Sequence, residues 1–258
     1  MTRVAWLLAA GLFAAQPAWA ADGAIHLRGS RALVPAAQRI AEAYMASHPG
    51  VTIVVRDGDS GPGLKGLLDG TVDIAMISAD IPAETAKRAQ TLKISPRVEP
   101  VALDAVVPVV HPTNPVASLS MEQLGAIYGG ARGDWLVLAL PTNSGTAAAW
   151  REAVLGDRIQ TPKAEILSAK AMAAKVAAEP SAIGYLALGA VDSTVKALAI
   201  DGIAATPEAI RDGGYPLRRQ LALVTTESAG PAVRHFVAHF LSAEAQAALG
   251  QTGLLPLK

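Results

Sequence analysis

Apolar runs alternate with amphipathic segments along this chain. Residues 51–55, 72–77 and 136–140 are short runs of mostly apolar side chains, and such runs are typical of buried strands. Residues 35–47 instead repeat their apolar side chains at the spacing of one helix face. Strands that alternate with helices indicate an α/β fold, in which helices cover both faces of a mostly parallel sheet.

Two further apolar runs are longer than the others. They cover residues 98–111 and 215–225. A strand of this length often leaves one domain and enters another, so the pair predicts a chain that crosses twice between two lobes. We expect lobe 1 to comprise residues 21–105 together with 219–258, and lobe 2 to comprise residues 106–218.

The first 20 residues have the pattern of a signal peptide. Arg3 precedes an apolar stretch over residues 4–15, and residues 18–20 (Ala-Trp-Ala) form a small-x-small cleavage site. The apolar stretch is too short to span a bilayer. We therefore expect residues 1–20 to be removed on export. The mature chain is then expected to be a periplasmic, or secreted, monomer that is not inserted in the membrane.

Charge and composition exclude several classes of function. Lys and Arg together number 22, and so do Asp and Glu. This balance argues against nucleic-acid binding and offers no polybasic membrane anchor. The chain contains no cysteine, which excludes disulfides, thiolate metal sites, a cysteine nucleophile and a lipid-modified cysteine. We expect neither a cofactor nor a metal ion.

Three small polar turns each follow a predicted strand and precede a predicted helix. They are Gly29-Ser30-Arg31, Asp59-Ser60-Gly61 and Ser144-Gly145-Thr146. The first N–H groups of a helix are unpaired and favour negative charge, so such turns can bind an anion. Any one of them could be an ordinary N-cap. Three of them at strand ends, where α/β folds place their pockets, predict a single oxyanion site.

The order and spacing of many short segments carry a family resemblance. These segments are Gly29-Ser30 with Pro35, residues 60–63, 70–74, 111–116, 119–124, 128–130 with Trp135, 144–146, 182–185, 215–217, and 240–242 with Gln246, Gly253 and Pro256. In this arrangement the chain resembles the periplasmic phosphate-binding proteins of ABC transporters over nearly its whole mature length. The resemblance implies a two-lobed type II periplasmic binding fold with a double-crossover hinge. It also implies a non-enzymatic protein that captures phosphate, or a related tetrahedral oxyanion, for a transporter permease.

The same resemblance implies which residues hold the anion. The expected ligand-binding set is Ser30, Arg31, Ala32, Ser60, Gly61, Asp73, Ser144, Gly145 and Thr146. Hydroxyl and backbone N–H groups of the turns would donate to the anion. The carboxylate of Asp73 would accept a hydrogen bond from protonated phosphate. Sulfate carries no such proton at neutral pH, so this carboxylate would reject it.

Two positions depart from the family pattern. Leu140 stands four residues before Ser144, at a position where the family usually has an arginine. Ala79 follows Ser78, at a position where many relatives also have an arginine. Losing a charge-assisted donor weakens oxyanion binding. We expect Arg31 to point into the cleft and replace it, the alternative being a solvated surface side chain. The departures also leave open a second function, as a periplasmic sensor or adaptor or as a receptor for another ligand.

Two other motifs suggest different chemistry. Residues 58–61 (Gly-Asp-Ser-Gly) imitate the nucleophile motif of trypsin-like proteases, but the α/β pattern does not fit a double β-barrel. His235 and His239 have the i,i+4 spacing that can bind zinc. The sequence offers them no evident third ligand, and Phe236 and Phe240 mark the same segment as a packing helix. Neither a hydrolase nor a zinc site is expected.

Overall fold

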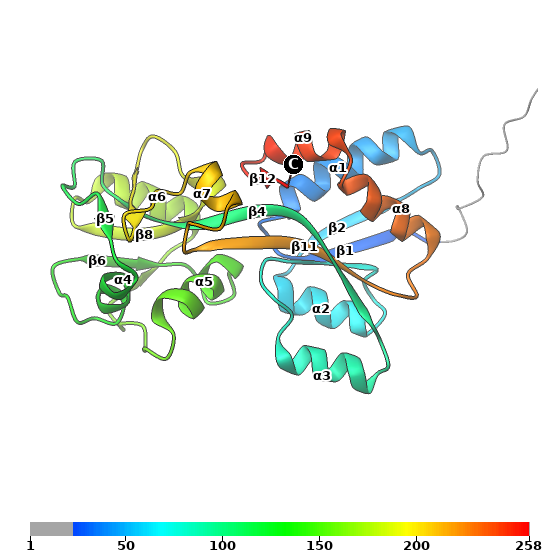
Figure 1. The fold of residues 1–258 in the computed structure, drawn as a ribbon, viewed down its shortest axis with the longest axis horizontal. Coiled ribbons are helices and arrows are strands. Elements are labelled where there is room, and N and C mark those ends of the chain that lie inside the picture. The colour runs from blue at the N-terminus through cyan, green and yellow to red at the C-terminus, as the bar shows by residue number, and fades with distance from the viewer. Residues whose placement is uncertain (1–22, 258) are drawn as a thin grey trace, which may run out of the picture.

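The computed structural model describes residues 23–257, and within them the chain forms two α/β lobes that lie side by side (Figure 1). Two long strands, β4 (Pro96–Val110) and β11 (Arg218–Thr226), run from one lobe to the other. The predicted α/β class and double crossover are therefore confirmed. The predicted signal peptide lies outside the described residues. No helix within residues 23–257 combines the length and apolar character needed to cross a membrane.

Lobe 1 is built on three parallel strands. They are β1 (Ile25–Gly29), β2 (Ile53–Asp57) and β3 (Ile74–Ile77). The sheet order is β2-β1-β3-β11-β4, with β11 antiparallel to both of its neighbours. The carboxyl ends of β1, β2 and β3 lie together at one edge of this sheet, because the three strands are parallel.

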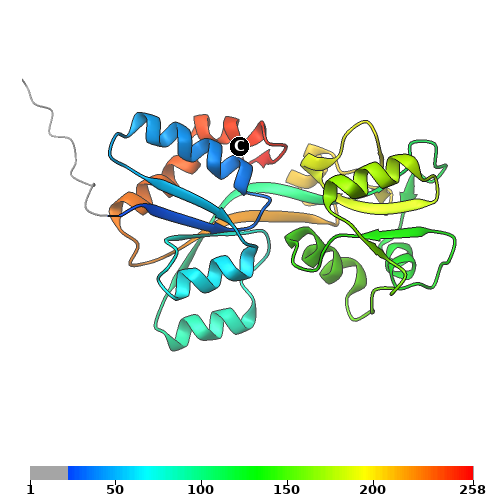
Figure 2. The same cartoon turned by 180° about the vertical axis from the view of Figure 1, so that it is seen from behind.

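Helices cover both faces of the lobe 1 sheet. They are α1 (Val34–Ser47), α2 (Ser60–Leu68), α3 (Ala83–Thr91), α8 (Pro231–Phe240) and α9 (Ala243–Gly250), and the short strand β12 (Leu255–Pro256) follows. Alternate residues of β3 serve the two faces: Ile74 and Met76 pack in the core with α1 and α8, whereas Ala75 and Ile77 pack with α2. Figure 2 shows the same layers from behind, with the blue helix α1 and the cyan helix α2 on opposite sides of the sheet.

The two crossing strands pair with each other along most of the length of β11. Arg219 stands opposite Asp104, and the register shifts between Leu221 and Ala222. The second crossing strand begins at residue 218 rather than at 215. Tyr215 instead buries its ring and donates its hydroxyl to the carbonyl of Val106 at 3.1 Å.

The strands that belong to lobe 2 alone are short, and they pair in both parallel and antiparallel directions. Its elements are β5 (Ser118–Leu119), α4 (Met121–Tyr128), β6 (Leu136–Ala139), α5 (Gly145–Trp150), a π-helical segment (Arg151–Leu155), β7 (Glu165–Ile166), α6 (Ala169–Ala178), β8 (Ala182–Ala187), a 3-10 turn (Leu188–Ala190), β9 (Lys196–Ala197), β10 (Ala199–Ile200) and α7 (Pro207–Arg211). Strand β8 is antiparallel to β4 and parallel to β6. Helix α4 begins with a capping box, in which Ser120 and Gln123 each accept a backbone N–H of the other.

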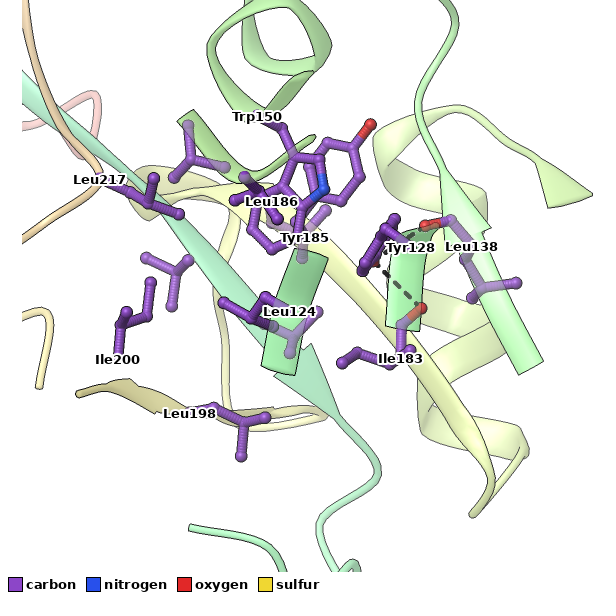
Figure 3. Packing of buried hydrophobic residues seen from close by; sticks show 14 of the residues in the cluster. Leu124, Tyr128, Leu138, Trp150, Ile183, Tyr185, Leu186, Leu198, Ile200 and Leu217 are labelled. Carbon is purple, nitrogen blue, oxygen red and sulfur yellow. Dashed lines mark hydrogen bonds between the residues drawn. The ribbon is translucent and has the colours of Figure 1, made fainter. Parts of the chain in front are cut away.

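Aromatic side chains fill the core of lobe 2 (Figure 3). Trp150 stacks on Tyr185 with ring centroids 4.3 Å apart, and Tyr128 packs edge-on against Trp150. The Tyr128 hydroxyl donates to the carbonyl of Leu138 in β6 at 3.1 Å. This core therefore supports the end of β6 and the turn that follows it.

Candidate functional site

Three serines lie at the carboxyl edge of the lobe 1 sheet. Ser30 follows β1, Ser60 begins α2 just after β2, and Ser78 follows β3. The backbone N–H of Ser78 donates to the hydroxyl oxygen of Ser60 at 3.2 Å, and that of Ser30 donates to the carbonyl of Met76 at 2.8 Å. Ser30 is 2% exposed and Ser78 is 1% exposed. The expected set contained Ser30 and Ser60 but not Ser78, although Ser78 ends an apolar run in the same way.

The third polar turn begins helix α5 of lobe 2. Ser144 is the N-cap residue, and its hydroxyl oxygen accepts the backbone N–H of Ala147 at 3.4 Å. Helix α5 continues without a break into the π-helical segment. The strand–turn–helix arrangement that the sequence predicted around Ser144 is therefore present.

The two lobes meet where this turn faces the serines of lobe 1. A Cβ atom added to Gly145 would lie 2.8 Å from the hydroxyl oxygen of Ser78 and 4.0 Å from that of Ser30. A Cβ atom at this distance would displace the hydroxyl of Ser78, so glycine is the residue that fits this approach without a shift. The structure thus brings Ser30 and Ser60 together with Gly145 and Thr146, although they come from separate lobes.

A buried arginine lies beside the same turn. Arg219 donates from Nε and Nη2 to Oδ2 of Asp104, at 2.9 and 2.5 Å, and from Nη2 to Oγ1 of Thr146 at 3.1 Å. Arg219 is 8% exposed and Asp104 is fully buried. Among the described residues, Nη1 of Arg219 is one of three buried side-chain atoms that have no hydrogen-bond partner. Asp104 interrupts an apolar run and so could have been noticed in the sequence, but nothing local shows that Arg219 is its partner.

Arg31 lies in a different environment from Arg219. Its guanidinium is 3.9 Å from a carboxylate oxygen of Asp57 and 3.8 Å from one of Asp59, and its side chain is 52% exposed. Exposed ion pairs of this kind contribute little free energy. The predicted role of Arg31 in the cleft stays a prediction. Ala32 packs against the core of lobe 1, and a Cβ atom on Gly61 would meet nothing within 4 Å.

Asp73 is not brought to the other predicted site residues, and its assignment to the anion site is corrected. It precedes β3, and its Oδ2 accepts the backbone N–H of His26 at 2.8 Å. Ser78 lies at the other end of β3. Five residues of extended chain at ~3.3 Å each separate the two by roughly 16 Å. Asp73 instead borders a cavity of about 460 Å³ at the amino edge of the sheet.

Leu140 packs into the core of lobe 2, with its side chain buried. Its backbone N–H donates to the hydroxyl oxygen of Tyr185 at 3.1 Å. Burial raises the pKa of Tyr185 to about 12, so this hydroxyl stays protonated at neutral pH. Position 140 therefore contributes an aliphatic side chain to the core and no cation to the site. Ala79 is exposed.

The histidines suggested for zinc lie on the outer side of lobe 1. Nδ1 of His235 is 2.5 Å from the hydroxyl oxygen of Tyr44. The ring of Tyr44 stacks on the ring of His48 and packs edge-on against the ring of His239. In residues 23–257 no group of three or more histidines, cysteines and acidic residues is placed to hold a metal ion.

Comparisons with known proteins agree with this architecture. The family model described as the PBP superfamily domain matches residues 14–244. The phosphate-binding protein PstS of Bacillus subtilis (strain 168) is 28% identical over an alignment of 208 residues, and this match covers 76% of this chain and 68% of that protein. An ABC-type phosphate transport receptor from Vibrio cholerae has a TM-score of 0.81 at 24% identity, over 90% of this chain and 99% of that one. A putative phosphate ABC transporter substrate-binding protein from Clostridium perfringens, solved with bound phosphate, has a TM-score of 0.79 at 26% identity. That match covers 92% of this chain and all (100%) of the other.

Proposed function

This chain belongs to the PBP superfamily, and from that premise we propose that it captures phosphate, or a related tetrahedral oxyanion, between its two lobes for an ABC transporter. The proposal does not rest on the family alone. Relatives named as phosphate-binding proteins span most of the chain, and the polar turns of both lobes meet at one place.

The hydrogen-bond direction at three hydroxyls is the observation that carries the proposal. The hydroxyl oxygens of Ser60, Ser144 and Thr146 each accept an N–H from the protein. A hydroxyl has a single proton to donate. No hydrogen bond within residues 23–257 takes the proton of any of these three groups. Each is thus left to donate outward, as binding to the oxygens of an anion requires.

Backbone N–H groups add fixed donors to these hydroxyls. Helix α2 begins at Ser60 and α5 at Gly145, and the first N–H groups of each helix lack partners within it. A tetrahedral oxyanion offers four oxygens, so it can bridge donors that come from two lobes. In this proposal the anion holds the lobes together, and the closed form is what a permease recognises.

Binding in this site needs no covalent step. The family is one of substrate-binding proteins. No hydrogen bond among the described residues joins a histidine to Ser30, Ser60 or Ser144, so these hydroxyls lack the histidine partner of a Ser-His-Asp triad. We propose that the protein catalyses no reaction.

A carboxylate other than Asp73 is needed if phosphate is to be told from sulfate. Asp59 immediately precedes Ser60, and its Oδ1 is buried without a hydrogen-bond partner. An unpaired carboxylate oxygen accepts the proton of hydrogen phosphate and repels sulfate, which carries none. We assign the selective role to Asp59.

The remaining parts of the proposal concern location, assembly and lobe limits. We propose an exported, periplasmic monomer. We also propose lobe limits at residues 105/106 and 218/219. In support, the buried side chains from Leu103 to Leu217 pack in one core, which begins within three residues of the first limit, and those of 25–102 and 221–254 pack in others.

Calorimetric titration of the phosphate-stripped mature protein tests the function. Phosphate is titrated first, and sulfate, arsenate and tungstate follow. Tight binding of phosphate with exclusion of sulfate is the expected result. Failure to bind any of these anions contradicts the proposal and favours the sensor or adaptor function that the buried side chain of Leu140 suggests.

A further inference from the structure

Within residues 23–257, Arg219 is the one buried Lys or Arg side chain, and it contacts the lobe 2 turn of the proposed site. Leu140 offers no cation, and Arg31 is half exposed between two carboxylates. Arg219 is buried and donates to Thr146, one of the hydroxyls assigned to the anion. We infer that Arg219 binds the oxyanion and takes the place of the arginine that Leu140 replaces. This inference rests on the proposed function, since it names a further residue of the same site.

Two of the N–H donors of the Arg219 guanidinium have no acceptor in the structure. A guanidinium carries five N–H donors. Nε uses its one on Asp104, and Nη2 uses its two on Asp104 and Thr146. Both N–H groups of Nη1 are buried and without a partner in the structure. A buried donor left unpaired is unfavourable, and two adjacent ones on a cation match an oxyanion.

The partner of Arg219 fixes where these free donors point. Asp104 is fully buried, its Oδ2 accepts from Arg219, and its Oδ1 accepts the backbone N–H of Leu188 at 3.3 Å. Both oxygens are engaged, so the carboxylate is held on two sides. It holds the planar guanidinium in one orientation, as a fork needs for directional binding.

The position of the pair in the fold suits an anion that contacts both lobes. Arg219 and Asp104 stand opposite each other on β11 and β4, the two strands that join the lobes. Thr146 links Arg219 to the turn of lobe 2. Gly145 in that turn lies against Ser78 of lobe 1. The guanidinium is thus at the base of the contact between the lobes.

Arg218 provides a matched control on the same strand. It is the neighbouring residue, so its side chain points to the opposite face of the sheet. It is exposed and donates to the carbonyl of Ile210 rather than to a residue of the site. Removing its charge changes the net charge of the protein by the same amount as removing that of Arg219.

Calorimetric titration with inorganic phosphate tests the inference on the phosphate-stripped mature protein. Because charged hydrogen bonds are stronger than neutral ones, Arg219→Gln is expected to weaken binding about tenfold to hundredfold. Arg218→Gln is expected to change it by less than about twofold. Arg219→Lys, which keeps the charge but not the fork, is expected to fall between the native protein and Arg219→Gln.

A second variant keeps the test valid if Arg219→Gln alone does not fold. Arg219→Gln leaves the carboxylate of Asp104 buried without its partner, which is destabilising. The double variant Asp104→Asn with Arg219→Gln removes both charges, and its thermal unfolding shows whether it is folded. The folded double variant is expected to lose the same tenfold to hundredfold in phosphate affinity.

The outcomes separate this inference from the proposed function. Native protein that binds no phosphate overturns the proposed function and the inference with it. Native protein that binds phosphate, with folded Arg219 variants of undiminished affinity, overturns the inference alone. The same holds if Arg31→Ala weakens phosphate binding while Arg219→Gln leaves it unchanged, because Arg31 is then the cation of the site.

Discussion

At both the carboxyl edge and the amino edge of the lobe 1 sheet, a polar side chain accepts a backbone N–H, but only one of the two edges belongs to the proposed site. At the carboxyl edge, the side chain of Ser60 accepts the backbone N–H of Ser78, and at the amino edge, the side chain of Asp73 accepts that of His26. Only the carboxyl edge faces lobe 2, through Gly145. A polar residue beside a strand is therefore a site candidate only if it lies at the end of the strand that faces the second lobe.

The largest expected effect is a loss of stability when the aromatic stack beneath the Ser144-Gly145-Thr146 turn is removed. Trp150 is fully buried and stacks on Tyr185, whose hydroxyl accepts the N–H of Leu140 just before the turn. Trp150→Ala leaves a large cavity there and is expected to lower the free energy of unfolding by about 3–5 kcal/mol. Urea unfolding measures this change.

Trp135→Ala is the matched control, because Trp135 is only half-buried against the same core. Its cost is expected to be clearly smaller than that of Trp150→Ala. Equal costs for the two variants would show that the aromatic stack does not hold the turn opposite lobe 1.

The contact between the lobes is tested next. A Cβ atom on Gly145 would lie 2.8 Å from the hydroxyl oxygen of Ser78, so in Gly145→Ala either that hydroxyl rotates away or the lobes move apart at the carboxyl edge. We expect phosphate binding to weaken by about 1–3 kcal/mol, the usual range for an overpacked contact. Gly133→Ala is the control, since nothing lies within 4 Å of its added Cβ. Unchanged affinity in Gly145→Ala would mean that the bound form does not use this contact.

The sequence predicted the features that depend on nearby residues and missed those that depend on residues far apart in the chain. The strands, the helices and the N-caps depend on residues a few positions apart, which is why the turn at Ser144 and the α/β class were predicted. Asp73 was placed in the site because its segment fits the family order. That order alone does not show at which end of β3 the residue lies.

Arg219 was missed for a different reason. It pairs with Asp104 across 115 positions of the sequence, and the two meet only because β11 and β4 are antiparallel neighbours. No spacing rule connects such residues. The interruption of an apolar run by Asp104 was visible, since a buried carboxylate needs a partner, but the partner could be identified only once the topology was known.

A matched pair of alanine variants compares the two edges directly. Ser60→Ala and Asp73→Ala each remove a side chain that accepts one backbone N–H. Each is expected to lower the free energy of unfolding by about 0.5–1.5 kcal/mol. Only Ser60→Ala is expected to weaken phosphate binding, by about 1 kcal/mol, because its hydroxyl proton also serves the anion. Titration and urea unfolding of both variants measure this, and weaker binding in Asp73→Ala would restore Asp73 to the site.

The smallest expected effect concerns the protonation of His239, near the carboxyl end of helix α8. Burial lowers the pKa of His239, the charges of His48 and His235 lower it further, and Glu244 opposes them. Acidification therefore protonates this histidine more readily in the unfolded chain than in the folded one. Its contribution to stability is present above the unfolded pKa of ~6.5 and is lost as the pH falls below that value.

Replacing this histidine should flatten the pH dependence of stability. We expect His239→Gln to lose less unfolding free energy than the native protein between roughly pH 7.5 and pH 5.5, as measured by urea unfolding at both values. Arg234→Gln on the same helix is the control, because arginine keeps its charge throughout this range. If His239→Gln keeps the full native pH dependence, burial of this ring does not couple protonation to folding.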